Sequence, residues 1–394
     1  TLHYKFPMEK YKCKSVGIIG SGIQGICIGL QLIKKGIPVT IFDRQDPLSQ
    51  EFKPASYGNA GHFSPYAVLQ FNRTDILSDV PKMLLSSYGP LALKWNYFPK
   101  LIPWIFNYLK NFNTKSMLHT AKYMHQILSL SNDAYEEIFE EIDTNGLVEK
   151  NGIIYVWTNK NLKSRELEIK IRNELGIEQK LLTQKEVLDL EPNLQPVFDA
   201  GVIYETAMHA KDPHGILKKI FKLFLERGGK FIQSNVTALE QINSNETEIK
   251  TETIDYKFEK TVVASGAFSK HLTDQLGENI PLDTERGYHV HFKNKEHLIK
   301  RPVIFLDRGF GMTPMNQGLR AVGTVELGGL NNPPSKKRIE YIIKCAKELL
   351  PELGKHEDEW LGFRPTLPDF LPVMGPSKNH KNVFYCFGHH HLGW

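Results

Sequence analysis

Hydrophobic positions change their spacing near the start of the chain in a way that predicts a strand, a helix and a second strand. Residues 15–20 (SVGIIG) form a short apolar run that is typical of a buried strand. Apolar residues then recur at helical spacing from Ile23 to Ile33, and Gly36 is expected to end that helix. Residues 39–43 (VTIFD) predict a second strand that ends in an acid. The order of these elements is that of a βαβ unit.

The later chain predicts both kinds of element. Asp212 and Pro213 have the residue types of an N-cap and a first helical position, so a helix is expected over 213–229. Ser335 is expected to open a second amphipathic helix, over 336–350. Strands are predicted at 230–233, 286–293, 302–307 and 319–326, and a hairpin that leads into a buried strand at 253–266.

Residues 16–33 allow a second interpretation. They are uncharged and follow a lysine-bearing segment, which is also the pattern of a signal peptide or a membrane anchor. The segment contains several glycines and two glutamines, however, and a β-branched strand follows it. The βαβ interpretation is therefore favoured.

Gly20, Gly22 and Gly25 form a GxGxxG motif at the predicted strand-to-helix turn. In a dinucleotide-binding unit the first glycine permits the tight turn, the second lets the backbone approach a pyrophosphate, and the third allows close helix–strand packing. The helix N-terminus attracts the phosphates. Asp43 is placed to accept hydrogen bonds from ribose hydroxyls, which argues against a 2′-phosphate. A dinucleotide site is therefore favoured over a plain glycine-rich turn.

The residues after Asp43 bear on the choice between FAD and NAD. An NAD domain usually continues with further βαβ units, whereas residues 44–65 are a loop rich in Gly, Pro, Ser and Asn. Long loops of this kind are usually functional or disordered. The small residues at 58–61 (GNAG) suit a backbone that lies against a flat ligand.

Length and charge narrow the class of protein. A chain of 394 residues suggests two domains, and 41% hydrophobic with 24% charged residues is ordinary for a globular protein. The net charge of +5 is scattered, so no nucleic-acid partner is expected. The four cysteines lie far apart, which predicts neither a zinc site nor a disulfide framework and favours a reducing, cytoplasmic setting.

Arg364 stands in residues 362–376 (GFRPTLPDFLPVMGP), which are otherwise short of charge. A guanidinium is costly to bury unless an anion meets it. Either Asp369 or another acid of the protein meets the charge, or a ligand does. The scarcity of acids nearby favours the ligand.

The chain resembles the FAD-dependent oxidoreductases related to D-amino-acid dehydrogenases and oxidases, glycine oxidase and sarcosine oxidase, and most of all the bacterial D-amino-acid dehydrogenase branch. The resemblance rests on stretches that occur in the same order and span almost the whole chain: 17–25 (GIIGSGIQG), 56–65 (SYGNAGHFSP), 261–269 (TVVASGAFS), 282–290 (LDTERGYHV), 362–376 and 387–394 (FGHHHLGW).

This resemblance implies an α/β fold with a Rossmann-like FAD-binding domain and a discontinuous substrate domain built on a large, mainly antiparallel sheet. The expected FAD domain comprises residues 1–66, 199–270 and 355–394, and the expected substrate domain 67–198 and 271–354. Non-covalent FAD is expected, because the cysteine that sarcosine-oxidase relatives use is absent from residues 361–365 (LGFRP).

The resemblance also implies which residues contact the cofactor: Gly20, Gly22, Ile23, Gln24, Gly25, Asp43, Arg44, Asn59, Ala60, Gly61, Val236, Ser265, Gly266, Gly362, Gly388, His389, His391, Leu392 and Gly393. The run 389–391 is not expected to bind a metal, since adjacent residues seldom converge on one ion. His390 stands where the family usually has glycine.

The implied activity is oxidative deamination of a small amino acid, with the D form favoured. A hydride passes from the α carbon to flavin N5, and the imino acid hydrolyses to a keto acid and ammonia. Arg364 is expected to bind the substrate carboxylate, Tyr288 to add a hydrogen bond near the flavin, and His62 to touch the substrate. Tyr288 has the alternative of a strand tyrosine packed in a sheet, and His62 that of a histidine merely hydrogen-bonded in place.

Other functions stay open. These are oxidation of a secondary amine such as sarcosine, dimethylglycine or a D-hydroxyproline-like compound, a non-catalytic flavoprotein subunit, and a nicotinamide enzyme. The electron acceptor is oxygen, a quinone or an electron-transfer partner. Residues 88–113, which are aromatic with scattered lysines, fit either a peripheral contact at the inner membrane or helices of the substrate domain, and the second is favoured.

Overall fold

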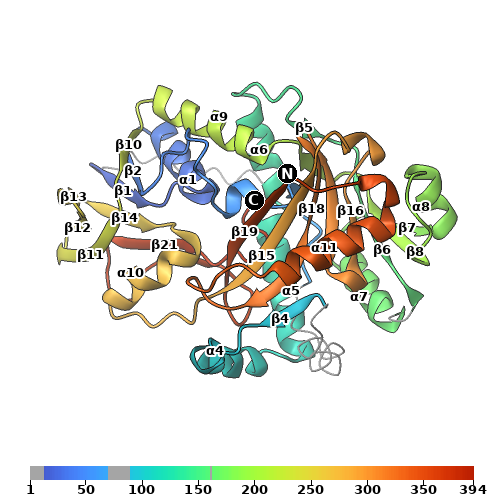
Figure 1. Ribbon diagram of the computed structural model, residues 1–394. Helices are drawn as coiled ribbons and strands as arrows, with labels where there is room; N and C mark the ends of the chain where they lie inside the picture. The colour runs from blue at the N-terminus through green and yellow to red at the C-terminus, as the bar shows by residue number, and fades with distance from the viewer. Residues whose placement is uncertain (1–12, 70–88, 160–161) are drawn as a thin grey trace. The chain divides into compact units, whose positions relative to one another are not determined.

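The computed structural model describes residues 13–69, 89–159 and 162–394 (Figure 1). Some predictions therefore fall outside the described residues. They concern residues 1–12 of the predicted FAD domain and residues 70–88 of the predicted substrate domain, which include Tyr88 of the aromatic segment.

The chain divides into two compact units. Of the described residues, unit 1 contains those up to Phe52 and those in Ile220–Ile280 and Val373–Phe387, and unit 2 contains those in Lys53–Lys219, Pro281–Pro372 and Gly388–Trp394. Both units are discontinuous, and their limits differ from the boundaries that the sequence predicts. The assignment of FAD to one domain and substrate to the other stays a prediction.

Unit 1 is built on a six-stranded sheet in the order β10-β2-β1-β14-β21-β20. Its pairs are parallel except for β20, which runs antiparallel to β21. A smaller sheet has the order β11-β12-β13. The strands of unit 1 are β1 (Val16–Ile19), β2 (Val39–Asp43), β10 (Lys230–Gln233), β11 (Val236–Asn243), β12 (Glu246–Thr251), β13 (Tyr256–Phe258), β14 (Lys260–Val263), β20 (Val373–Pro376) and β21 (Val383–Phe387).

The predicted βαβ unit is confirmed. Helix α1 (Ile23–Lys34) joins β1 to β2, and these two strands pair in parallel. Ile23, Ile26 and Leu30 are its buried apolar residues, at the spacing of one helix face. Strand β14 is the predicted buried strand, but β13 forms its hairpin with β12 rather than with β14.

Unit 2 is built on a nine-stranded sheet in the order β19-β15-β18-β17-β16-β6-β8-β7, with β4 beside β18. Most pairs are antiparallel, whereas β16 with β6 and β18 with β4 are parallel. A small sheet has the order β3-β9-β5. The strands of unit 2 are β3 (His62–Phe63), β4 (Leu91–Leu93), β5 (Val148–Glu149), β6 (Ile153–Trp157), β7 (Lys180–Thr183), β8 (Ala200–Tyr204), β9 (Met208–Ala210), β15 (Asp283–Phe292), β16 (Val303–Phe305), β17 (Phe310–Met315), β18 (Gly318–Leu327) and β19 (Asp358–Thr366).

Helix α11 lies across β15 and β18, as Figure 1 shows, and its apolar face forms one core with them. It runs over Lys336–Leu349 with Ser335 as its N-cap, as predicted. The predicted helix after Asp212 is α9 (Pro213–Glu226), which begins in unit 2 and ends in unit 1. The other helices are α2 (Ala55–Gly58), α4 (Phe98–Lys110), α5 (Thr114–Leu128), α6 (Ser131–Phe139), α7 (Leu162–Glu174), α8 (Gln184–Leu190) and α10 (Ser269–Gln275).

Strand β15 has two different faces. Tyr288, Val290 and Phe292 belong to the core under α11. Because side chains alternate along a strand, Glu285 and Gly287 lie on the opposite face. Nearly all of β15 is buried, so neither face is marked by exposure.

Close packing of α1 on β1 requires Gly25. A Cβ there would lie 1.9 Å from the carbonyl oxygen of Gly20, which is backbone and cannot rotate away. We expect Gly25→Ala to lower the free energy of unfolding by about 1–3 kcal/mol, because the added methyl group overpacks this contact. Unfolding in denaturant measures the effect. Gly36→Asn is the control, because a Cβ at Gly36 would meet nothing within 4 Å and Asn tolerates positive φ. Equal stability of both variants would contradict this account.

Candidate active site

The predicted dinucleotide site of unit 1 is the turn between β1 and α1, whose backbone forms an open cradle. Gly20 has a φ of 109°, and a Cβ there would lie 2.5 Å from the carbonyl oxygen of Ala264. Gly22 is the N-cap of α1 and provides no side-chain cap. The turn thus leaves bare backbone at the positive end of a helix, which is the arrangement that binds phosphates.

Asp43 ends β2 and braces this turn. Its Oδ2 accepts hydrogen bonds from the amide (2.8 Å) and the hydroxyl (2.9 Å) of Ser21, and its Oδ1 accepts one from the Gln45 amide at 3.2 Å. The predicted contact with ribose stays a prediction. The Arg44 guanidinium lies over the ring of Phe268, 4.4 Å from its centroid, in a cation–π contact.

Other predicted cofactor residues of unit 1 lie at the ends of its elements. Ile23 and Gln24 are the first residues of α1, and Val236 is the first residue of β11. Ser265 precedes a 3-10 turn that starts at Gly266, whose φ is 56°.

The predicted flavin-facing loop belongs to unit 2, and its backbone is held by hydrogen bonds to one of its own side chains and to other residues of the unit. The Asn59 side chain accepts a hydrogen bond from the Gly61 amide at 2.6 Å, and the Gly61 carbonyl accepts one from the Ala210 amide at 2.6 Å. The buried Arg320 donates to the carbonyls of Asn59 (2.7 Å) and Tyr57 (3.2 Å). These contacts fix the path of the loop before any ligand binds.

His62 follows this loop, and its tautomer can be assigned. The Thr313 hydroxyl donates its one proton to the Ala60 carbonyl at 2.9 Å, so it accepts from His62 Nε2, 2.8 Å away. Nδ1 of His62 therefore carries the lone pair. Burial, with a smaller effect of His209, lowers the pKa of His62 to about 3. His62 is therefore a neutral hydrogen-bond acceptor at neutral pH.

Arg364 projects from β19 and lies across β15 at Gly287. A Cβ on Gly287 would lie 2.3 Å from Nη2 of Arg364, so glycine makes room for the guanidinium. Nη1 donates to the carbonyl of Thr324 at 3.0 Å. Thr324 has a φ of 62°, which is strained for a β-branched residue, and it lies at an irregularity in the pairing of β15 with β18. Such irregularities often redirect groups beside active sites.

Glu285, which the sequence analysis missed, stands directly opposite Arg364 in the β15–β19 ladder. It is 5% exposed, and its Oε2 lies 2.8 Å from Nε2 of His390. Burial acts to raise the pKa of Glu285, but His390 and Arg364 outweigh it and lower the pKa below its usual value. The available signals were an acid immediately before the strand predicted at 286–293 and the departure from glycine expected at His390.

The backbone conformation of His390 is one that favours glycine, the residue that the resemblance led us to expect there. Its φ is 56°, in the region that glycine enters without strain. Its amide donates to the carbonyl of Pro365 at 2.9 Å, which attaches the C-terminal segment to β19.

Asp369, the other acid considered for Arg364, has different partners. Its carboxylate accepts from the Leu371 amide at 3.1 Å, and its carbonyl accepts from the Thr120 hydroxyl at 3.0 Å. Burial raises its pKa, whereas the carboxylate that acts on the pKa of Arg364 is Glu285.

Three of the predicted residues come together in unit 2. Desolvation, His390, Arg364 and His62 all lower the pKa of His391 well below its usual value. Arg364 and His62 are thus close enough to His391 to act on its charge, and Glu285 joins this region through its contact with His390 and its pairing with Arg364.

The remaining predicted residues of the C-terminal segment form a turn. Gly388 has a φ of 85°, and the amide of Leu392 donates to the carbonyl of His389 at 2.9 Å. Gly393 follows this turn, and its predicted contact with the cofactor stays a prediction.

Gly362 lies under the indole of Trp360. A Cβ on Gly362 would be 1.8 Å from that ring, and one on Gly58 would be 2.3 Å from it. Trp360 also stacks on His289, with ring centroids 4.9 Å apart. The observed reason for glycine at these positions is therefore the tryptophan ring, and the predicted cofactor contact of Gly362 stays a prediction.

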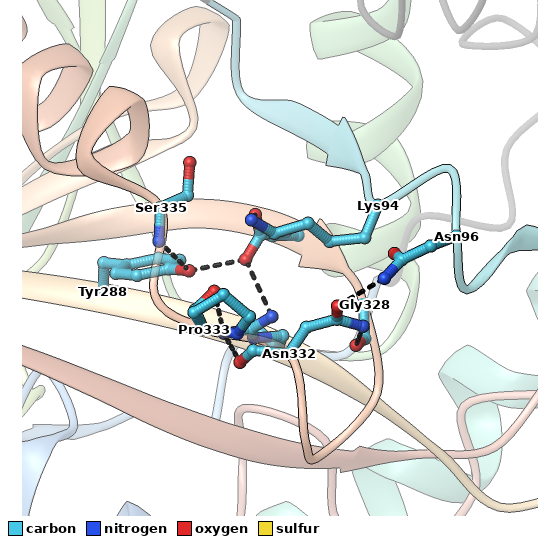
Figure 2. Close-up of polar contacts among 9 residues, drawn as sticks. Lys94, Asn96, Tyr288, Gly328, Asn332, Pro333 and Ser335 are labelled. Atoms are coloured by element: carbon cyan, nitrogen blue, oxygen red, sulfur yellow. Dashed lines mark hydrogen bonds and ion pairs between the residues drawn. The ribbon is translucent and has the colours of Figure 1, made fainter.

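Tyr288 lies on the other face of β15 from Arg364, within a polar network that Figure 2 shows. Its hydroxyl donates to Glu326 Oε2 at 2.5 Å and accepts from the Ser335 amide at 3.1 Å. Glu326 also pairs with Arg286 (3.4 Å) and Lys94 (3.6 Å). Burial, with Glu326, raises the pKa of Tyr288, so the phenol stays protonated.

Arg286 extends the same network toward the start of α11. Its Nη2 donates to the carbonyls of Asn332 (2.8 Å) and Pro333 (3.0 Å). The Asn332 side chain links the Asn96 amide with the Gly328 carbonyl (Figure 2). These contacts favour a structural role for Tyr288, and its predicted role near the flavin stays a prediction.

The model of the FAD dependent oxidoreductase family matches residues 15–394. The chain belongs to this family. It is 32% identical over 386 residues to a D-amino-acid oxidase from Bradyrhizobium diazoefficiens, with 96% of this chain and 91% of the relative covered. It is 27% identical to a D-amino acid dehydrogenase from Vibrio atlanticus, with the same coverage.

Solved structures show the same fold. Glycine oxidase from Geobacillus kaustophilus superposes with a TM-score of 0.72 at 19% identity, over 96% of this chain and 90% of the other. The L-proline dehydrogenase from P. horikoshii has a TM-score of 0.69 at 18% identity, with 97% and 89% covered. The predicted α/β architecture is thereby confirmed.

The protein is therefore an FAD-dependent oxidoreductase, which decides between FAD and NAD. The glycine cradle of unit 1 fits the pyrophosphate of FAD, because its backbone is bare and the positive end of α1 starts there. No helix within the described ranges is long and apolar enough to cross a membrane. The described residues also contain no group of three or more potential metal ligands.

The two roles considered for Tyr288 lead to different outcomes. We expect Tyr288→Phe to lower the free energy of unfolding by about 1–3 kcal/mol, because Glu326 loses a donor and the Ser335 amide loses its acceptor. The KM of the amine that reduces the flavin should stay unchanged. Unfolding and steady-state kinetics measure the two effects, and unchanged stability with a raised KM would support the substrate role instead.

Proposed function

We propose that the protein oxidises a small amino acid at the carbon that bears the amino group, with the D form favoured. The imino acid then hydrolyses to a keto acid and ammonia. Bound FAD would accept the two electrons of the reaction. The residues of the chain therefore mainly bind and orient the substrate. The observation that carries this proposal is the partly buried guanidinium of Arg364, held on the backbone of Gly287 and Thr324.

Arg364 is proposed to bind the substrate carboxylate through paired hydrogen bonds. A guanidinium matches a carboxylate in geometry and charge, and Nη1 is already oriented by the Thr324 carbonyl. His62 is proposed to touch the substrate as a neutral acceptor, since its Nε2 is engaged by Thr313 and its pKa is about 3. The cofactor is proposed to be bound non-covalently.

The proposed D preference is supported by the names of the relatives, a D-amino-acid oxidase and several D-amino acid dehydrogenases. Oxidation of a secondary amine remains the alternative, because the same guanidinium would bind the carboxylate of sarcosine or a cyclic imino acid. A flavoprotein subunit without turnover is the alternative from another class.

We propose that α4 and the turn before it contact a membrane surface, where a quinone would accept the electrons from the flavin. Trp95, Ile102, Phe106 and Leu109 are 65%, 51%, 61% and 51% exposed, and the last three follow helical spacing. Residues 89–132 contain several lysines and no acid. An exposed apolar face within a purely cationic segment suits an anionic lipid surface.

Anaerobic titration with D-, L- and N-methyl amino acids tests the proposed reaction. We expect small D-amino acids to bleach the flavin absorbance. Arg364→Met should raise the KM by about 30- to 5,000-fold, equivalent to about 2–5 kcal/mol for a lost buried charge pair. Arg227→Met, on an exposed arginine, is the matched control.

Other outcomes assign the alternatives. Bleaching only by N-methyl or cyclic compounds would establish the secondary-amine reaction. If no amine bleaches a fully loaded flavin, the proposed reaction is wrong and the flavoprotein subunit takes its place.

Co-sedimentation with vesicles tests the membrane contact. We expect the protein to sediment with phosphatidylglycerol vesicles at low salt, and Phe106→Asp to reduce the bound fraction about tenfold because a buried aromatic contact is lost. Ile254→Asp is the matched control, since Ile254 and Phe106 are each 61% exposed. A wild-type protein that stays in the supernatant with these vesicles would refute the contact.

A further inference from the structure

The proposed function assigns a role to Arg364, which binds the substrate carboxylate, but it does not account for the acid beside it, Glu285. Glu285 is buried, ionised and directly opposite Arg364 in the ladder. Residues opposite each other have Cβ atoms about 4.5–5.5 Å apart. A negative charge at that place repels a second carboxylate, so it opposes the binding of a ligand that carries only a carboxylate.

The two opposite charges point to different partners. The guanidinium of Arg364 lies over Gly287 and donates to the Thr324 carbonyl at 3.0 Å. The carboxylate of Glu285 meets His390, with 2.8 Å between Oε2 and Nε2. The site thus presents a positive and a negative group side by side on one face of β15 and β19.

An α-amino acid carries a cationic and an anionic group on one carbon, which matches this arrangement. We propose that Glu285 binds the ammonium group of the substrate while Arg364 binds its carboxylate, so that the pair selects zwitterionic amino acids over plain carboxylates. His390 holds Oε2 of Glu285, and the ammonium takes Oε1. This proposal deepens the proposed function and rests on it.

A purely structural role for Glu285, as a counter-charge for the partly buried Arg364, gives a different expectation. Removing a structural counter-charge disturbs the arginine and weakens every ligand that binds it. Removing an ammonium-binding group weakens amino acids only. It also relieves the repulsion of plain carboxylates, so the two kinds of ligand respond in opposite directions.

The test uses the FAD-loaded full chain and the matched ligands D-alanine and propanoate, which differ only in the amino group. We expect Glu285→Gln to raise the KM for D-alanine about 10- to 100-fold, as loss of a charge-assisted hydrogen bond does. The dissociation constant of propanoate, from its perturbation of the flavin spectrum, should stay equal or fall. Asp283→Asn is the control, because it removes a negative charge from the same face of β15. The Asp283 carboxylate accepts hydrogen bonds from the Tyr97 hydroxyl and has no proposed contact with the substrate.

Each outcome is decisive. Weaker binding of both ligands, or of neither, overturns the proposal. If Glu285→Gln does not load FAD, Glu285→Asp replaces it, and selective weakening of D-alanine supports the proposal whereas equal effects overturn it. If no amino acid reduces the wild-type flavin, the proposed function is wrong. The role of Glu285 is then still tested by the dissociation constants of D-alanine and propanoate, both measured from the change in the flavin spectrum.

Discussion

The guanidinium of Arg364 rests on bare backbone at Gly287, and the arrangement of the candidate site follows from that contact. Any side chain at Gly287 would occupy the space of Nη2. The Thr324 carbonyl, turned by a strained residue at an irregularity of β18, then fixes the direction of the charged group. The strain at Thr324 costs free energy that the surrounding sheet must supply, which is typical of sites that hold a group in a defined position.

The alternation of side chains along β15 separates two buried charge systems. On the α11 face, Glu326 is shared by Tyr288, Arg286 and Lys94, and these partners join β15, β18 and the loop before α11. This network satisfies the acid many times over and stiffens the sheet. On the other face, and among the residues that the structure describes, Glu285 contacts His390 and Arg364 donates to the Thr324 carbonyl. The network of Glu326 thus lies behind the face on which Arg364 and Glu285 are proposed to bind the substrate.

In unit 1, too, glycines leave space beside a positively charged group, here the N-terminal end of helix α1. Gly25 lets α1 approach β1, and this brings the positive end of the helix to the turn at Gly20 and Gly22. Asp43 holds the turn through Ser21. This turn fits the pyrophosphate of FAD, the cofactor of the family to which the chain belongs.

The sequence by itself determined the features that depend on neighbours in the chain. Helical and strand periods, the glycine turn and the acid at Asp43 identified the βαβ unit, and the scarcity of charge around Arg364 identified the arginine. Only the tertiary structure decided which face of β15 each residue occupies. Both faces of that strand are buried, so polarity did not separate Tyr288, which points to α11, from Glu285. The pairing of Glu285 with His390 was equally hidden, because the contact depends on a ladder and a C-terminal turn that lie far apart in the sequence.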